Sequence, residues 1–154
     1  MNLYLIRHAH AVTAEENPAR PLSRKGHAQM RRLARFLRRS EVLRGVTFWH
    51  SPLTRAQQTA SLLADQLDSN NPLRRVHRLL HEGTPAEVAA QLVKRRTDLA
   101  LVGHEPRLGE LATLLVCGRA KPSRFNLERS GVIALTRQRG HWSVNWQLTP
   151  ELLP

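Results

Sequence analysis

The sequence predicts an α/β fold, a single-domain three-layer α/β/α sandwich over residues 1–154 with a mainly parallel sheet between two helical layers. Short apolar or β-branched runs alternate along the chain with longer amphipathic runs, which is the pattern of strands joined by helices. The length of 154 residues suits one domain. No repeat, low-complexity tract or linker interrupts the chain, and the polar turn at 68–72 is too short to separate two domains.

Six runs predict strands, because each is short, rich in apolar or β-branched residues and bounded by breakers. In chain order they cover 3–6, 46–50, 73–79, 99–104, 131–137 and 142–148. Helical patterns lie between most of them. Since helical crossovers join parallel strands, we expect a mainly parallel sheet that is covered on both faces.

Four longer runs predict helices. The first, at 24–39, follows Ser23 as an N-cap and repeats apolar residues at helical spacing. The third begins behind Thr84, a second capping residue that is followed by proline. The second, third and fourth helices are expected over 53–67, 85–96 and 107–117.

The charge of the chain is strongly positive. The formal net charge is +12, and 21 of the 24 basic residues are arginines. Such an excess suits phosphate-bearing partners. Aromatic residues make up only 5% of the chain, however, and the arginines are spread along it, several on the solvated face of the helix at 24–39. Dedicated nucleic-acid binding is therefore not expected.

Other features of the sequence concern its cellular setting. The first residues lack a basic leader followed by a continuous apolar region, and no apolar run approaches the length of a membrane span. We therefore expect a cytoplasmic protein without a membrane partner. The one cysteine, Cys117, lies in an apolar run and is expected to be buried.

The expected strand ends collect reactive side chains. Ligands of such sheets bind at the carboxyl ends of the strands. The first strand ends in Arg7 and His8, the second is followed by Arg55 at the start of a helix, the third leads to Glu82, and the fourth ends at His104. We expect these side chains to share one rim of the sheet.

Three interpretations compete for His8. It could be a hydrogen-bonded core residue, a metal ligand paired with His10, or a nucleophile beside a fixed cation. Arg7 directly precedes His8 and would repel a metal ion, and the other strand ends lack an oxygen-rich ligand cluster. We therefore expect no metal and no other cofactor.

Phosphoryl transfer suits this set of residues best. Arg7 and Arg55 can present guanidinium groups to a phosphate or sulfate anion. A cationic pocket would lower the pKa of His8 and keep its ring neutral for attack. His104 would stabilise the transferring group, and Glu82 could protonate the leaving atom and later activate water.

Four segments in this order resemble the motifs of the histidine phosphatase superfamily, which is related to phosphoglycerate mutase. They are "RHAHA", "RPLSRKG", "SPLTRAQQTA" and "LVGHEPRLGEL". The C-terminal "SGVIALT" and "WQLTPELL" are similar to the bacterial phosphohistidine phosphatases of the SixA branch. The resemblance implies a phosphoglycerate mutase-like fold, with His8 as phosphate acceptor, Arg7 and Arg55 as phosphate ligands and His104 completing the pocket. Ala9 and His10 depart from the glycine and the acidic or amide residue that are common there.

The resemblance also bears on the substrate. Larger members carry an inserted helical segment over the site, and neither the turn at 67–73 nor the short link from Glu82 to Thr84 leaves room for one. An open site admits a side chain of another protein, so the expected partner is a phosphohistidine-bearing protein, such as an acidic histidine phosphotransfer or phosphocarrier domain. The alternatives are a phosphatase for small phosphate esters, nucleotides or polyphosphate, and a non-enzymatic module that binds nucleic acid or phosphoproteins.

Overall fold

A mixed six-stranded sheet organises the fold in this computed structural model, which describes residues 1–67, 72–79 and 83–153. Its strands lie in the order β3-β2-β4-β1-β5-β6. They are β1 (Asn2–Arg7), β2 (Thr47–His50), β3 (Leu73–Arg75), β4 (Leu99–Gly103), β5 (Val132–Gln138) and β6 (His141–Leu148). The first four in chain order run parallel, whereas β5 is antiparallel to β1 and to β6. Two residues with positive φ, Arg139 and Gly140, join β5 to β6 in a tight hairpin, which imposes the antiparallel pairing.

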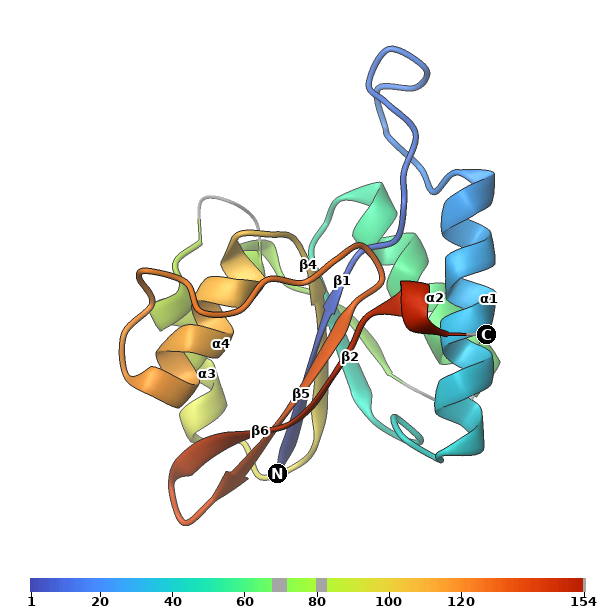
Figure 1. Cartoon of the computed structure of the whole chain (residues 1–154). Coiled ribbons are helices and arrows are strands. Elements are labelled where there is room, and N and C mark those ends of the chain that lie inside the picture. The colour runs from blue at the N-terminus through green and yellow to red at the C-terminus, as the bar shows by residue number, and fades with distance from the viewer. Residues whose placement is uncertain (68–71, 80–82, 154) are drawn as a thin grey trace.

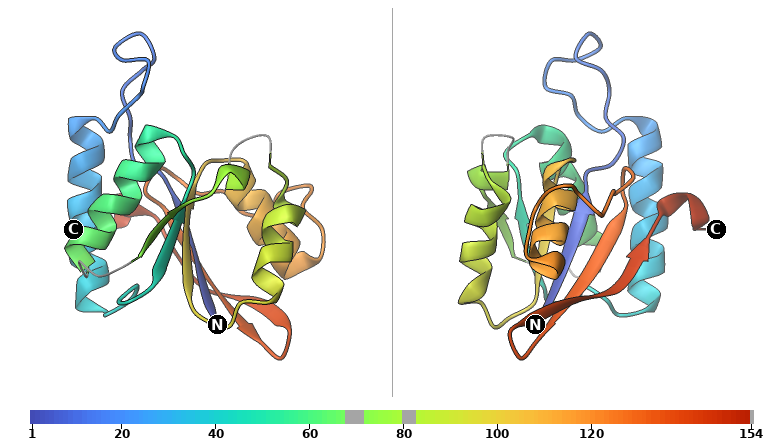
Figure 2. Two further views of the ribbon diagram at one scale, coloured as in Figure 1. Left: turned by 180° about the vertical axis from the view of Figure 1, so that it is seen from behind. Right: turned by 60° about the vertical axis from the view of Figure 1, so that its left-hand side comes forward.

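The α-helices of the described ranges form the two outer layers. They are α1 (Arg24–Arg39), α2 (Thr54–Leu67), α3 (Pro85–Val93) and α4 (Arg107–Cys117). Figure 1 and Figure 2 show α1 and α2 on one face of the sheet and α3 and α4 on the other. The predicted three-layer sandwich is thus confirmed, and so are the predicted bounds of α1 and α4.

Three predictions for single segments were wrong. The strand expected at 73–79 ends at Arg75, and a 3-10 turn, η1 (His77–Leu79), follows it. The helix expected to reach residue 96 ends at Val93, where Arg137 of β5 donates to the carbonyls of Leu92 and Val93 that the helix leaves unpaired. Cys117 is exposed, because it is the last residue of α4 and lies beyond the buried part of the helix, which ends at Thr113.

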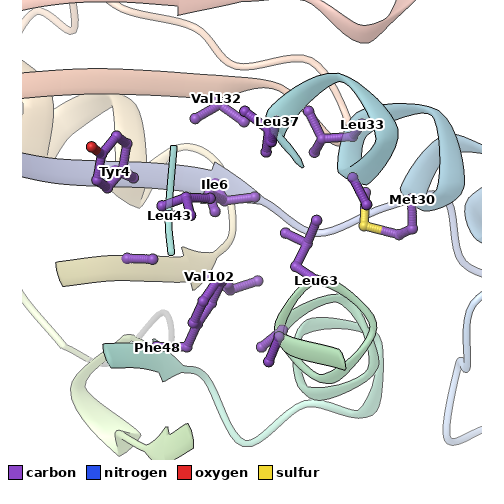
Figure 3. Packing of buried hydrophobic residues seen from close by; sticks show 14 of the residues in the cluster. Tyr4, Ile6, Met30, Leu33, Leu37, Leu43, Phe48, Leu63, Val102 and Val132 are labelled. Atoms are coloured by element: carbon purple, nitrogen blue, oxygen red, sulfur yellow. The ribbon is translucent and has the colours of Figure 1, made fainter. Parts of the chain in front are cut away.

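The core consists of two layers, one on each face of the sheet. Along β1, Tyr4 and Ile6 belong to the cluster under α1 and α2, whereas Leu3 and Leu5 belong to the cluster under α3 and α4. Figure 3 shows Ile6 between apolar side chains of both covering helices on its side. Each fully buried aliphatic side chain contributes roughly 1.5–3 kcal/mol. Burial on both faces fixes β1, and with it the residues at its carboxyl end.

The link from β1 to α1 is held by a close backbone contact. Ser23 caps α1 by accepting from the N–H of Gly26, and its own N–H donates to the carbonyl of His10. A Cβ at Gly26 would lie 2.1 Å from that carbonyl oxygen. Only glycine lets α1 start this close to the end of β1. Beyond this contact the loop at 12–21 projects away from the rim in every view (Figure 2).

None of the helices in the described part of the chain is both long and apolar enough to cross a membrane.

Candidate active site

Backbone hydrogen bonds to three different elements fix the carboxyl end of β1. The N–H of Arg7 donates to the carbonyl of Gly131 before β5, and the N–H of His8 donates to that of Gly103 in β4, both at 3.1 Å. The N–H of Ala9 donates to the hydroxyl of Thr59 in α2, also at 3.1 Å. The position of His8 is therefore set by the sheet and by α2 together.

The His8 ring is buried, with 8% of its surface exposed. Its Nδ1 lies 2.7 Å from the carbonyl oxygen of Ala9, which can only accept, so Nδ1 carries the proton of the neutral ring. The lone pair then lies on Nε2, where the Nε–H of Arg55 donates to it at 3.3 Å. The hydroxyl of Thr59 also donates to the carbonyl of Arg55 at 2.7 Å. The same side chain therefore fixes the backbone at Ala9 and at Arg55.

His104 lies against His8. It follows β4, is 4% exposed, and its ring centroid is 5.0 Å from that of His8. Its Nε2 hydrogen bonds with the hydroxyl of Ser51 at 2.6 Å. Ser51 in turn is fixed by its N–H, which donates to the carbonyl of Val102 at 3.1 Å. The sequence analysis gave Ser51 no role in the site, although its position directly after β2 could have indicated one.

Arg7 is oriented through the loop before β5. Its Nη1 donates to the carbonyl of Leu127 at 2.7 Å, while the N–H of Leu127 donates to a carboxylate oxygen of Glu105 at 2.8 Å. The second Glu105 oxygen accepts from Gly109 at 3.2 Å, and burial raises the pKa of this carboxyl. The buried Nε of Arg7 has no hydrogen-bond partner among the described residues. The carbonyl of Leu127 thus holds the guanidinium of Arg7 in place.

The pKa of His8 is lowered to about 4. Burial is the largest cause; the hydrogen bond to Ala9 opposes it, and the positive charges of Arg55, Arg7 and Arg129 add to it. The sequence predicted this direction from the cations alone, whereas desolvation of the ring contributes most. His8 is consequently neutral at pH 7, with its lone pair on Nε2.

This pKa predicts an acid-dependent loss of stability. Between an unfolded-state pKa of about 6.5 and the folded value of about 4, the unfolded chain binds a proton at His8 that the folded chain excludes, so stability falls as pH falls through this window. From pH 7 to 4.5, His8 should cost about 2 kcal/mol of unfolding free energy. Urea unfolding of wild type and His8→Gln at both pH values measures the difference. His141→Gln, an exposed control, should retain the wild-type pH dependence; an unchanged dependence in His8→Gln would contradict the prediction.

Glu82 and His10 were also considered as site residues from the sequence. Glu82 lies outside the described residues. His10 turns toward α1, where its Nδ1 hydrogen bonds with the Ser23 hydroxyl at 2.7 Å. The described ranges contain no group of three or more His, Cys, Asp or Glu side chains placed to hold a metal ion. The site therefore assembles Arg7, His8, Arg55 and His104, with Ser51 beside them.

Comparisons with known proteins identify the family of the chain. The family model of the histidine phosphatase superfamily (branch 1) matches residues 3–83. An uncharacterized protein of Picosynechococcus sp. is 32% identical over 143 residues, which is 88% of this chain and 84% of that protein.

Solved structures are similar over nearly the whole chain. The protein histidine phosphatase SixA in complex with tungstate has a TM-score of 0.85 and 25% identity, with 97% of each chain covered. The α-ribazole phosphatase of Shigella flexneri has a TM-score of 0.80 at 17% identity, again covering 97% of each chain. A phosphoserine phosphatase of Entamoeba histolytica, in complex with phosphoserine, has a TM-score of 0.72 at 16% identity, covering 99% of each chain. The chain belongs to the histidine phosphatase superfamily and is a metal-independent phosphatase.

Proposed function

We propose that the protein hydrolyses phosphohistidine on other proteins through a phosphoenzyme intermediate on His8. The observation that carries this proposal is the open rim. The α-helices of the described ranges flank the sheet instead of lying over its carboxyl end, and the loop at 12–21 extends outward beyond that end without folding back over it (Figure 1). An open site buries little of a small ligand, but it admits a side chain projecting from a protein surface.

The first step forms a bond between His8 and phosphorus. The lone pair of Nε2 attacks the phosphorus atom as the bond from phosphorus to the substrate imidazole breaks. The Nε–H of Arg55 donates to Nε2 in the structure, so its guanidinium shifts onto the phosphoryl oxygens when the substrate binds. The guanidinium of Arg7, held by the carbonyl of Leu127, supplies further positive charge beside these oxygens. Two guanidinium groups thus neutralise the charge of the transferring group.

The second step returns His8 to its free form. Water attacks the phosphorus of the phosphoenzyme, the bond to Nε2 breaks, and inorganic phosphate leaves. His104, oriented by Ser51, stabilises the oxygens in both steps. Glu82 is our candidate for protonating the leaving imidazole and for taking the proton from water. The carboxylate of Glu105 does not suit this role, because both of its oxygens accept backbone N–H groups.

SixA, the phosphatase 25% identical to this chain, is described as a protein histidine phosphatase. Its match supports the same substrate class here, because it has the higher identity and TM-score of the three solved structures compared. The α-ribazole and phosphoserine phosphatases, at 17% and 16% identity, share the fold alone.

A comparison of substrates tests the proposal. We expect kcat/KM for a phosphohistidine-bearing phosphotransfer domain to exceed that for phosphoserine, α-ribazole 5′-phosphate and nucleoside monophosphates by about 100-fold, equivalent to roughly 2.7 kcal/mol. The unphosphorylated domain, added as a competitor, controls for nonspecific binding. A small ester with the higher kcat/KM would overturn the proposed substrate while leaving the phosphatase chemistry in place.

A further inference from the structure

A groove leads out of the candidate active site along α1. Its first part, about 320 Å³, lies between Arg7 and His10 on one side and Arg129 on the other. Its second part, about 190 Å³, lies between Arg32 of α1 and the C-terminal turn η2 (Pro150–Leu152). The two parts share Lys25, Gln29 and Glu151, so they form one continuous groove. Figure 1 and Figure 2 show η2 beside the helix along which the groove runs.

The groove is lined by more cations than anions. Its charged lining consists of Arg7, Lys25, Arg32, Arg129, Glu128 and Glu151. Arg7 and Arg32 already donate to backbone carbonyls. Lys25 and Arg129 form no ion pair within 4.0 Å among the residues that the structure describes. These two cations are therefore available to a ligand.

Both free cations lie close to the reaction centre. Lys25 and Arg129 line the same part of the groove as Arg7, and the charge of Arg129 also contributes to the lowered pKa of His8. A ligand that reaches these cations would thus be joined to the group bound at Arg7 and His8. The groove begins at Arg7 of the phosphate pocket, but Lys25 and Arg129 lie outside that pocket, on the first turn of α1 and in the loop before β5.

The surface around the groove indicates an acidic polypeptide. The exposed face of α1 continues the positive charge without any acidic residue, through Arg24, Arg31, Arg35, Arg38 and Arg39. No aromatic ring of Phe, Tyr or Trp lines the groove to stack on a base. Glu128 and Glu151, which also line the groove, would repel a continuous phosphate backbone, but they can pair with occasional basic side chains of a protein.

We propose that the groove binds the polypeptide that flanks the phosphorylated residue, with Lys25 and Arg129 pairing with acidic side chains of that segment. This inference rests on the proposed function only in requiring a protein substrate. In this inference, Lys25 and Arg129 select substrates by the amino-acid sequence around the phosphorylated residue. The chemistry takes place separately, at His8.

Synthetic phosphopeptides test the inference. Each peptide carries phosphohistidine or phosphotyrosine, flanked either by glutamates or by glutamines. The readout is the ratio of kcat/KM for the glutamate peptide to that for the glutamine peptide, in which a general effect on phosphate binding cancels. For two partly exposed ion pairs we expect a ratio of roughly five to ten at low ionic strength, falling as salt is added.

The double variant Lys25→Gln/Arg129→Gln should reduce this ratio to about one. The matched control Arg119→Gln/Arg139→Gln removes the same charge elsewhere on the surface and should keep the wild-type ratio. A wild-type ratio near one, or a ratio retained by the groove variant, would overturn the inference. Inhibition by single-stranded DNA that only the groove variant relieves, without a glutamate preference, would assign the groove to nucleic acid instead.

The same data separate the inference from the proposed function. A glutamate preference with equal turnover of phosphohistidine and phosphotyrosine upholds the groove and counts against phosphohistidine as the substrate. A phosphohistidine preference without a glutamate preference gives the opposite result.

Discussion

Replacing His8 with alanine should reduce turnover by a factor of about 10⁴ or more, the scale of loss seen when a catalytic nucleophile is removed. The reason is structural as well as chemical. His8 is the buried imidazole whose Nε2 lone pair faces Arg55, and its Nδ1 proton is committed to Ala9. Ser51 fixes Nε2 of the neighbouring His104, so that ring is not placed as a substitute nucleophile.

Trapping with phosphorus-labelled substrate checks this prediction. After an alkaline quench, which preserves phosphohistidine, wild type should carry acid-labile label and His8→Ala should carry none. His141→Ala, an exposed substitution on β6, should label like wild type. Label retained on His8→Ala would place the intermediate on another residue.

Replacing Arg55 with lysine should lower kcat/KM by about 10²–10³, the usual loss on removing one fixed donor from a transition state. Lysine keeps the charge, but it lacks the planar guanidinium that can bind phosphoryl oxygens while its Nε–H orients Nε2 of His8. Because Thr59 holds the backbone of residue 55 in place, the variant should keep its fold.

Inhibition by inorganic phosphate and vanadate gives an independent measurement for Arg55. Both anions should inhibit Arg55→Lys more weakly than wild type, with the larger loss for vanadate, which can adopt the five-coordinate geometry of the transition state. Arg119→Lys is the matched control at an exposed position. Equal inhibition of Arg55→Lys and wild type would mean that the anion binds without Arg55.

Local patterns predicted most of the fold, and tertiary contacts decided where the predictions were wrong. The bounds of α1 and α4 followed from Ser23 as a cap and from apolar spacing. The last carbonyls of α3 accept from Arg137, which is distant in sequence but adjacent in space, and local patterns do not show such a contact. The antiparallel hairpin of β5 and β6 departs from the parallel sheet because the two residues between them leave no length for a crossover.

The candidate site was predictable where a strand end, or the start of the helix that follows it, carries a charged or imidazole side chain. Arg7, His8, Arg55 and His104 were predicted in this way, and the structure brings them together. Hydroxyl groups were harder to find. The role of Thr59 depends on its reaching the N–H of Ala9 from a different element, for which the sequence alone gives no spacing. Glu82, outside the described residues, remains a prediction.

The three consecutive N–H groups that anchor residues 7–9 have a consequence for how this surface can change during evolution. Because their acceptors lie before β5, in β4 and in α2, substitutions in the groove or in the loop at 12–21 leave the backbone of the nucleophile where it is. The backbone of residues 7–9 becomes ordered when the chain folds, so substrate binding costs little further conformational entropy there. Partner choice can therefore diverge rapidly between relatives while the bond-breaking step is conserved.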